Sequence, residues 1–118
     1  MAFAAKYLYI AAMDVDPDHE DIFNRIYDEE HVPNVLKVPG VQSGTRFRLR
    51  PAEVVSGGRR QSLELPLTGQ PTYQTIWELE RPEVLVSSEW ARAGGLGEWP
   101  TAVRPHLTNL RRVLLERI

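Results

Sequence analysis

The stretch IYDEEHVPNVLKVPGVQSGTRFR, residues 26–48, contains the end of a helix, a turn and a strand in direct succession. Pro33 disfavours helical geometry at the residue before it, so we expect the helix to end or kink near His31. The Pro–Gly pair at 39–40 marks a turn. Residues 41–50 then alternate between two faces, which predicts a β-strand.

The N-terminal segment before this stretch is apolar and then acidic. Residues 6–13, KYLYIAAM, are apolar on both alternating faces, which is typical of a strand covered on both sides of its sheet. No basic residues precede the apolar stretch, and it reaches acidic residues too early for a membrane span, so we expect a strand rather than a signal peptide. Asp16 suits a helix cap and Pro17 suits the first helical position.

The rest of the chain repeats the order of strand, helix and strand. Residues 51–71 contain three prolines and three glycines and predict a long loop, with a short strand at 62–65 as an option. Residues 72–80 predict a third strand, and 82–95 a second helical region, followed by one further helical turn. Residues 110–118 predict a fourth strand, with a C-terminal helix as the alternative, because Arg, Leu and Glu also favour helix.

The order β-α-β, loop, β-α-β predicts an α+β, ferredoxin-like βαββαβ fold, in which a four-stranded antiparallel sheet carries both helices on one face. The other face of such a sheet is bare, whereas the first strand has apolar residues on both faces. We therefore expect a second copy of the chain to cover that face, which makes the protein a homodimer. A chain of 118 residues predicts a single domain, 1–118.

The composition excludes several classes of site. The chain has no cysteine, which rules out disulfides, thiolate zinc sites and cysteine nucleophiles and suits a cytoplasmic location. The net charge of −2 provides no overall positive field, so we expect no nucleic acid and no membrane as partner.

The stretch at 26–48 resembles a motif of the dimeric α+β barrel superfamily, in particular its EthD-like group. The segments at 78–90 and 103–109 are also similar to later parts of members of that group. The residues that match the motif are, in order, Tyr27, His31, Pro33, Pro39–Gly40 and Arg46–Phe47.

This resemblance implies a homodimer whose two sheets pack face to face into a barrel, with small-molecule pockets between each sheet and its own helices. Members of the superfamily include polyketide cyclases, lactone isomerases, cofactor-free monooxygenases, haem enzymes and proteins with no known activity. A single histidine ligand for haem is conceivable here, but the chain is shorter than haem-binding members, so we expect no cofactor.

The first helix carries the candidate catalytic residues. Phe23, Tyr27 and His31 recur every four residues and form one stripe on the helix. The imidazole of His31, with an ordinary pKa of about 6.5, suits proton transfer. Tyr27 would polarise a substrate oxygen, and Asp28 would orient His31 or raise its pKa. The alternative is a half-buried histidine that simply stabilises the end of a helix.

Other residues suggest a binding cavity for an aromatic compound, although each of the aromatic side chains also suits a core. Arg46, Arg48 and Arg50 share one strand face. They would either hold an anionic substrate, or remain solvated or form salt bridges across a dimer interface. Asp28, Glu30 and His31 lack a second histidine at metal-ligand spacing, so we expect no metal. The candidate substrate-binding residues are Phe23, Tyr73, Trp77, Trp90, Trp99 and His106, the last also as a second proton-transfer group.

These residues predict a small homodimeric enzyme that performs cofactor-free acid–base chemistry of the isomerase, cyclase or lyase type. Its substrate would be a small aromatic, polyketide-like or lactone compound. One alternative is a non-catalytic small-ligand-binding or stress-related accessory protein. A further alternative is a cofactor-free monooxygenase that acts through a substrate carbanion.

Overall fold

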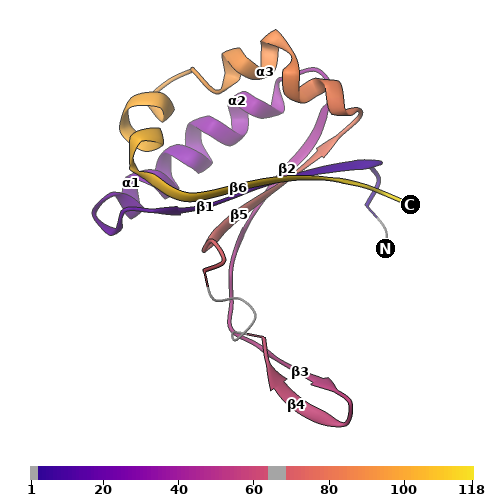
Figure 1. Ribbon diagram of the computed structural model, residues 1–118. Coiled ribbons are helices and arrows are strands. Elements are labelled where there is room, and N and C mark those ends of the chain that lie inside the picture. The colour runs from indigo at the N-terminus through magenta and orange to yellow at the C-terminus, as the bar shows by residue number, and fades with distance from the viewer. Residues whose placement is uncertain (1–2, 64–68) are drawn as a thin grey trace.

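The computed structural model describes residues 3–63 and 69–118. A four-stranded antiparallel sheet runs in the order β2-β5-β1-β6, and the helices cover one of its faces (Figure 1). The predicted ferredoxin-like arrangement is confirmed. The strands of this sheet are β1 Tyr7–Val15, β2 Val41–Arg48, β5 Tyr73–Leu79 and β6 Leu107–Glu116.

The first helical region is longer than predicted. Helix α1, Glu20–Ile26, leads into a π-helical turn, Tyr27–His31, and helix α2, Val32–Leu36, follows without a break. The Val32 N–H donates to the Tyr27 carbonyl, five residues back. A widened turn relieves the clash between a proline ring and the carbonyl four residues before it, so Pro33 is accommodated inside the helix. We expected the helix to end or kink near His31. It does not end there, and the irregularity at that place is the π-helical turn.

The second half of the chain follows the predicted order. A 3-10 turn, Pro82–Val86, precedes α3, Ser88–Ala93, whose first turn is capped by the Ser87 hydroxyl accepting from the Trp90 N–H at 3.1 Å. A second π-helical turn, Trp99–Val103, and a 3-10 turn then lead into β6. The last segment is a strand and not the alternative helix.

The prediction of a loop over 51–71 is wrong for its first half. Strands β3, Glu53–Ser56, and β4, Arg59–Ser62, form a hairpin that projects away from the sheet on the side opposite the helices (Figure 1). Gly57 and Gly58 both have positive φ, as a two-residue hairpin turn requires. The optional strand at 62–65 overlaps β4 only at its first residue, and residues 64 and 65 lie outside the described part of the chain.

The core lies between the helices and the sheet, and its fully buried members include Phe23, Tyr27 and Trp77. Within residues 3–63 and 69–118, no helix covers the opposite face of the sheet (Figure 1). There, β1 presents Leu8 and Ile10, which the register places opposite Leu115 and Val113 of β6. Val113 and Leu115 are about half exposed, at 49% and 48%, so this face is apolar and open in the single chain. In the described ranges, no helix is long and apolar enough to cross a membrane.

Candidate functional site

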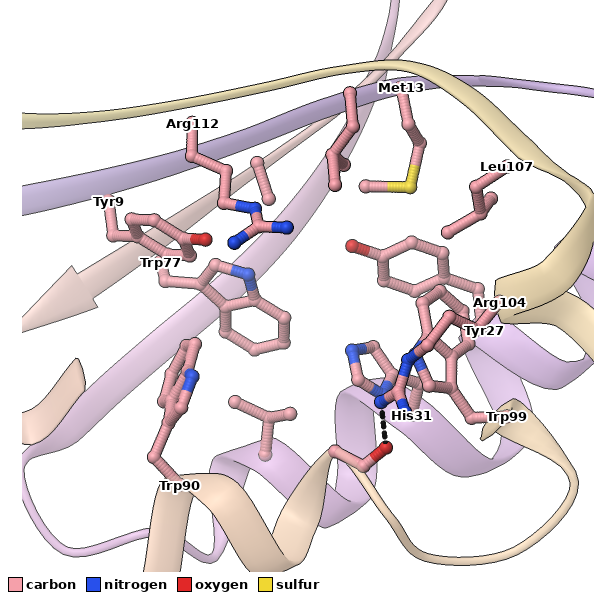
Figure 2. A pocket seen from close by; sticks show the side chains of 14 residues that line it. Tyr9, Met13, Tyr27, His31, Trp77, Trp90, Trp99, Arg104, Leu107 and Arg112 are labelled. Carbon is pink, nitrogen blue, oxygen red and sulfur yellow. Dashed lines mark hydrogen bonds between the residues drawn. The ribbon is translucent and has the colours of Figure 1, made fainter. Parts of the chain in front are cut away.

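A cavity of about 370 Å³ lies between the sheet and the helices that cover it. Figure 2 shows side chains from both layers converging on this space. This is the position that the resemblance implied for a small-molecule pocket, and the volume is within the usual range for such sites. The helices and turns contribute Tyr27, His31, Val35, Trp90, Trp99 and Arg104, and the strands contribute Tyr9, Ala11, Met13, Trp77, Leu110 and Arg112.

His31 reaches the cavity from the last position of the first π-helical turn. Its ring stacks on Trp99, with centroids 3.8 Å apart and planes 7° apart, and meets the edge of Tyr27 at 5.1 Å. Nδ1 of His31 is buried and has no hydrogen-bond partner among the residues that the structure describes. Burial, together with the nearby positive charge of Arg104, lowers the pKa of His31 to about 4. The imidazole is therefore neutral at neutral pH, and the expectation of an ordinary pKa is wrong.

Tyr27 places a protonated phenol beside this imidazole. The Thr75 hydroxyl donates to the Tyr27 oxygen at 2.7 Å, which leaves the proton of Tyr27 for a ligand in the cavity. Burial raises the pKa of Tyr27 to about 12, so the group acts as a hydrogen-bond donor and not as a phenolate. Figure 2 shows the hydroxyl directed into the cavity.

All three tryptophans proposed for substrate binding line the cavity. The indoles of Trp77 and Trp90 meet edge to face at 6.2 Å, and Tyr9 meets Trp90 in the same way at 5.6 Å. Gly44 of β2 lies directly against the Trp77 ring, and a Cβ at this position would collide with it. The glycine therefore allows this indole to lie beneath β2.

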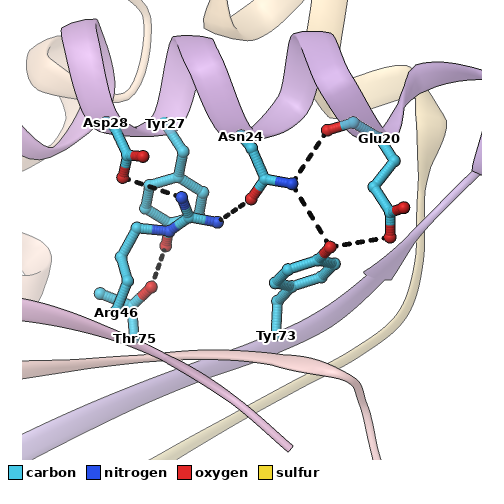
Figure 3. Close-up of polar contacts among 7 residues, drawn as sticks. All are labelled: Glu20, Asn24, Tyr27, Asp28, Arg46, Tyr73 and Thr75. Atoms are coloured by element: carbon cyan, nitrogen blue, oxygen red, sulfur yellow. Dashed lines mark hydrogen bonds and ion pairs between the residues drawn. The ribbon is translucent and has the colours of Figure 1, made fainter.

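Two of the other aromatic residues predicted to bind substrate, Phe23 and Tyr73, lie outside the cavity. Phe23 is fully buried and packs on Tyr27 and Tyr73, with ring centroids 5.4 and 4.9 Å apart. Tyr73 donates from its hydroxyl to Glu20 at 2.7 Å and accepts from Asn24 at 3.3 Å (Figure 3). Neither side chain lines the cavity.

Asp28 does not face the imidazole that it was expected to orient. Its carboxylate accepts from Arg46 at 2.8 Å, and the same guanidinium donates to Asn24 at 2.8 Å (Figure 3). The guanidinium also lies 4.3 Å above the centre of the Tyr27 ring. Arg46 therefore connects β2 to the first helix within one chain, and this largely buried position differs from the solvated arginine row considered above.

His106 is also outside the cavity. It stacks on His19, with centroids 3.5 Å and planes 11° apart. Together with Asp16, these side chains bring three potential ligand atoms within 4.8 Å of one another. Parallel imidazoles direct their lone pairs side by side and not toward one point, so the stacked rings do not form a tetrahedral metal site.

The sequence reasoning missed three polar residues of the cavity, namely Tyr9, Arg104 and Arg112. Arg112 lies opposite Ala11 in the register of β6 and β1, on the face covered by the helices. The alternation of β6 is the signal that would have found it, but only with the register known. Arg104 follows the second π-helical turn, where its guanidinium donates to the Gly94 carbonyl.

Comparison with solved structures identifies similar folds. An EthD family protein from Bacillus halodurans matches with a TM-score of 0.56 and 16% identity, over 95% of this chain and 99% of that one. The haem degrader MhuD from Mycobacterium tuberculosis, a structure with two haems in its active site, gives 0.58 and 16% over 95% of each chain. A putative antibiotic biosynthesis monooxygenase from Bordetella bronchiseptica gives 0.56 and 12%, over 95% of this chain and 96% of that one.

The chain has the α+β fold of the dimeric α+β barrel proteins. The resemblance to the EthD-like group is confirmed at the level of the fold. No protein-family model matches the chain. No curated protein matches it in sequence. Because the haem degrader matches over nearly its whole length, the argument that this chain is too short for a haem-binding relative is wrong.

Proposed function

We propose that the protein is a small enzyme that performs acid–base chemistry on a carbonyl compound of aromatic, polyketide-like or lactone type. The observation that carries this proposal is that a neutral His31 imidazole and a protonated Tyr27 phenol converge on one aromatic cavity. Nδ1 of that imidazole has no hydrogen-bond partner in the part of the chain that the structure describes. A base and an oxyanion donor beside each other are the two groups that enolisation requires.

In the proposed reaction, the substrate ring lies among the tryptophans and its carbonyl oxygen accepts from Tyr27. His31 removes a proton from the adjacent carbon, and the C–H electron pair becomes the C=C bond of an enolate, whose charge is held at the oxygen. Return of the proton to a different carbon gives an isomer, and attack of the carbanion on a second carbonyl gives a ring. Neither outcome consumes an oxidant or a reductant.

Because the pKa of His31 is low, the other residues of the site must stabilise the enolate. An imidazolium with a pKa of about 4 is a strong acid, so proton transfer to His31 is uphill unless the enolate is stabilised strongly. In the proposed reaction, Tyr27 and the nearby Arg104 supply that stabilisation, Tyr27 as a hydrogen-bond donor and Arg104 through its positive charge. The same low pKa is also compatible with the alternative of a ligand-binding protein without turnover, because a weak base still accepts a hydrogen bond from a ligand.

We further propose that the protein acts as a homodimer. The open apolar face that carries Ile10, Val113 and Leu115 supports this, because a face of this kind is usually covered by another layer. The cytoplasmic location and the absence of a cofactor stay predictions. Titration with haem, followed by absorbance, tests the second of them, and a saturable shift that disappears in His31→Gln would contradict it.

The experiment that tests the enzymatic proposal is proton exchange on a neutral probe ketone. In deuterated buffer, wild-type protein is expected to accelerate exchange of the α-protons of 2-tetralone, as followed by proton NMR. His31→Gln is expected to lose the acceleration, whereas His106→Gln, which removes a histidine outside the cavity, keeps it. Equal acceleration by His31→Gln and wild type would refute the role of His31. No acceleration by wild type would favour the binding alternative.

A further inference from the structure

The charged groups of the cavity point to the class of compound that it binds. Two arginines, Arg104 and Arg112, are among the residues that line it, and no acidic residue of the described ranges, 3–63 and 69–118, lines it. The chain as a whole carries a net charge of −2, so the positive charge of this cavity is local. Two guanidinium groups beside an aromatic pocket favour a ligand with a negative charge.

Arg112 reaches the cavity from β6. It lies opposite Ala11 on the face of the sheet below the helices, and Figure 2 shows its guanidinium directed into the cavity beside Tyr9. No hydrogen bond or ion pair joins Arg112 to another residue in the described ranges. Its neighbour Arg111, on the opposite face, donates to the Gly69 carbonyl instead.

Tyr9 adds a second donor at the same end of the cavity. Burial raises the pKa of its phenol, so the hydroxyl keeps its proton at neutral pH. A carboxylate accepts up to two parallel hydrogen bonds from one guanidinium and has lone pairs left for a phenol. Arg112 and Tyr9 therefore form a suitable pair for a carboxylate.

Arg104 and Arg112 lie at different distances from His31, the proposed base. Arg104 lies on the His31 side, where it lowers the pKa of the imidazole and donates to Gly94. In Figure 2, Arg112 lies on the other side of the cavity. A ligand anchored through a carboxylate at Arg112 would thus extend its other end toward His31 and Tyr27.

We propose that the natural ligand is an aromatic or polyketide-derived carboxylic acid, whose carboxylate is held by Arg112 with Tyr9 while its reacting carbonyl lies between Tyr27 and His31. This inference rests on the proposed function for the reacting end only. Binding of the carboxylate by Arg112 and Tyr9 does not depend on turnover.

The test compares two probes of the same shape. Isothermal titration calorimetry measures binding of 2-naphthoate and of its neutral analogue 2-naphthamide to wild-type protein. We expect naphthoate to bind at least about tenfold more tightly, since a bidentate charged pair is stronger than a neutral hydrogen bond. Arg112→Gln is expected to remove this preference by weakening naphthoate and leaving naphthamide nearly unchanged, and Arg112→Lys to retain part of it.

Arg59→Gln is the matched control, because it removes the same charge from the exposed hairpin. It is expected to leave the preference intact, and circular dichroism establishes that each variant is folded. Equal binding of the two probes to wild type, an unchanged preference in Arg112→Gln, or no binding of either probe at millimolar concentration would each overturn the inference. Because 2-tetralone has no carboxylate and 2-naphthoate no exchangeable C–H, failure of exchange with the preference intact refutes only the chemistry.

Discussion

The imidazole of His31 lies flat against the indole of Trp99, at a centroid separation of 3.8 Å. Each ring comes from a π-helical turn, His31 from the last position of the first and Trp99 from the first position of the second. The stack covers one face of the imidazole and fixes its orientation, so a ligand meets the edge or the other face of the ring. Such turns are often found at functional sites, and here two of them meet across one contact.

The first prediction concerns stability at acidic pH. The pKa of His31 is about 4 in the folded protein, against about 6.5 in an unfolded chain, so the unfolded state binds more protons between these values. Stability is therefore full above pH 6.5 and is lost as the pH falls toward 4, by roughly 3 kcal/mol from this group. Urea denaturation at several pH values measures this, and His31→Gln is expected to have a shallower pH dependence than wild type.

His106→Gln is the control for this measurement, and it should leave most of the acid destabilisation in place. If His31→Gln and wild type lose the same free energy of unfolding between pH 6.5 and 4, the imidazole is not held neutral by its surroundings.

The second prediction concerns the pH dependence of turnover. If neutral His31 is the base in the free enzyme, kcat/KM for a neutral ketone should rise with pH through about 4 and then stay level through neutral pH. A break near 6.5 would mean that His31 titrates as an exposed histidine does. The measurement is the rate of α-proton exchange between pH 3.5 and 8, over the range in which the protein stays folded.

The third prediction concerns the hydrogen bond behind the phenol. Thr75 is buried, and its hydroxyl donates to Tyr27 at 2.7 Å. Thr75→Val keeps the shape but removes the donor, which should cost about 1–2 kcal/mol of unfolding free energy. Thr108→Val changes an exposed threonine on β6 and should cost much less. Urea denaturation compares the two, and equal effects would mean that the buried bond contributes nothing beyond side-chain packing.

The fourth prediction concerns the open face of the sheet. Val113 and Leu114 are neighbours on β6 with similar exposure, 49% and 41%, but they point to opposite faces. Val113→Glu places a charge on the apolar open face and should convert a dimer into a monomer in light scattering. Leu114→Glu, on the other face, should stay dimeric. A wild-type protein that is monomeric at micromolar concentration would contradict the proposed homodimer.

The sheet was predictable from sequence because alternation determines which side chains share a face. β2 and β5 were found in this way. β1 was found because it is apolar on both faces, and the expectation of an open apolar face followed from it. The helix through Pro33 was not predictable from a local rule, because the rule assumes α-helical spacing and the π-helical turn changes it. The hairpin at Gly57–Gly58 did leave a signal, since two adjacent glycines are typical of a two-residue turn.

The site was predictable only in part, for a physical reason. His31, Tyr27 and the tryptophans carry recognisable chemistry, and they do meet at one cavity. The pKa of His31 is lowered mainly by burial, which exists only after folding, and further by Arg104, which lies far along the chain. Asp28 was expected to contact His31, three residues further along the helix. Its carboxylate instead pairs with Arg46 of β2, a neighbour that sequence spacing does not reveal.

Every tryptophan of the protein lines the same cavity. The native indole fluorescence is therefore an optical signal from that one place, whereas far-ultraviolet circular dichroism reports the sheet and helices as a whole. Melting curves from the two methods need not coincide. If the emission changes at a lower temperature than the dichroism, the cavity loosens before the fold is lost, and a compound that brings the two curves together has been bound at the cavity.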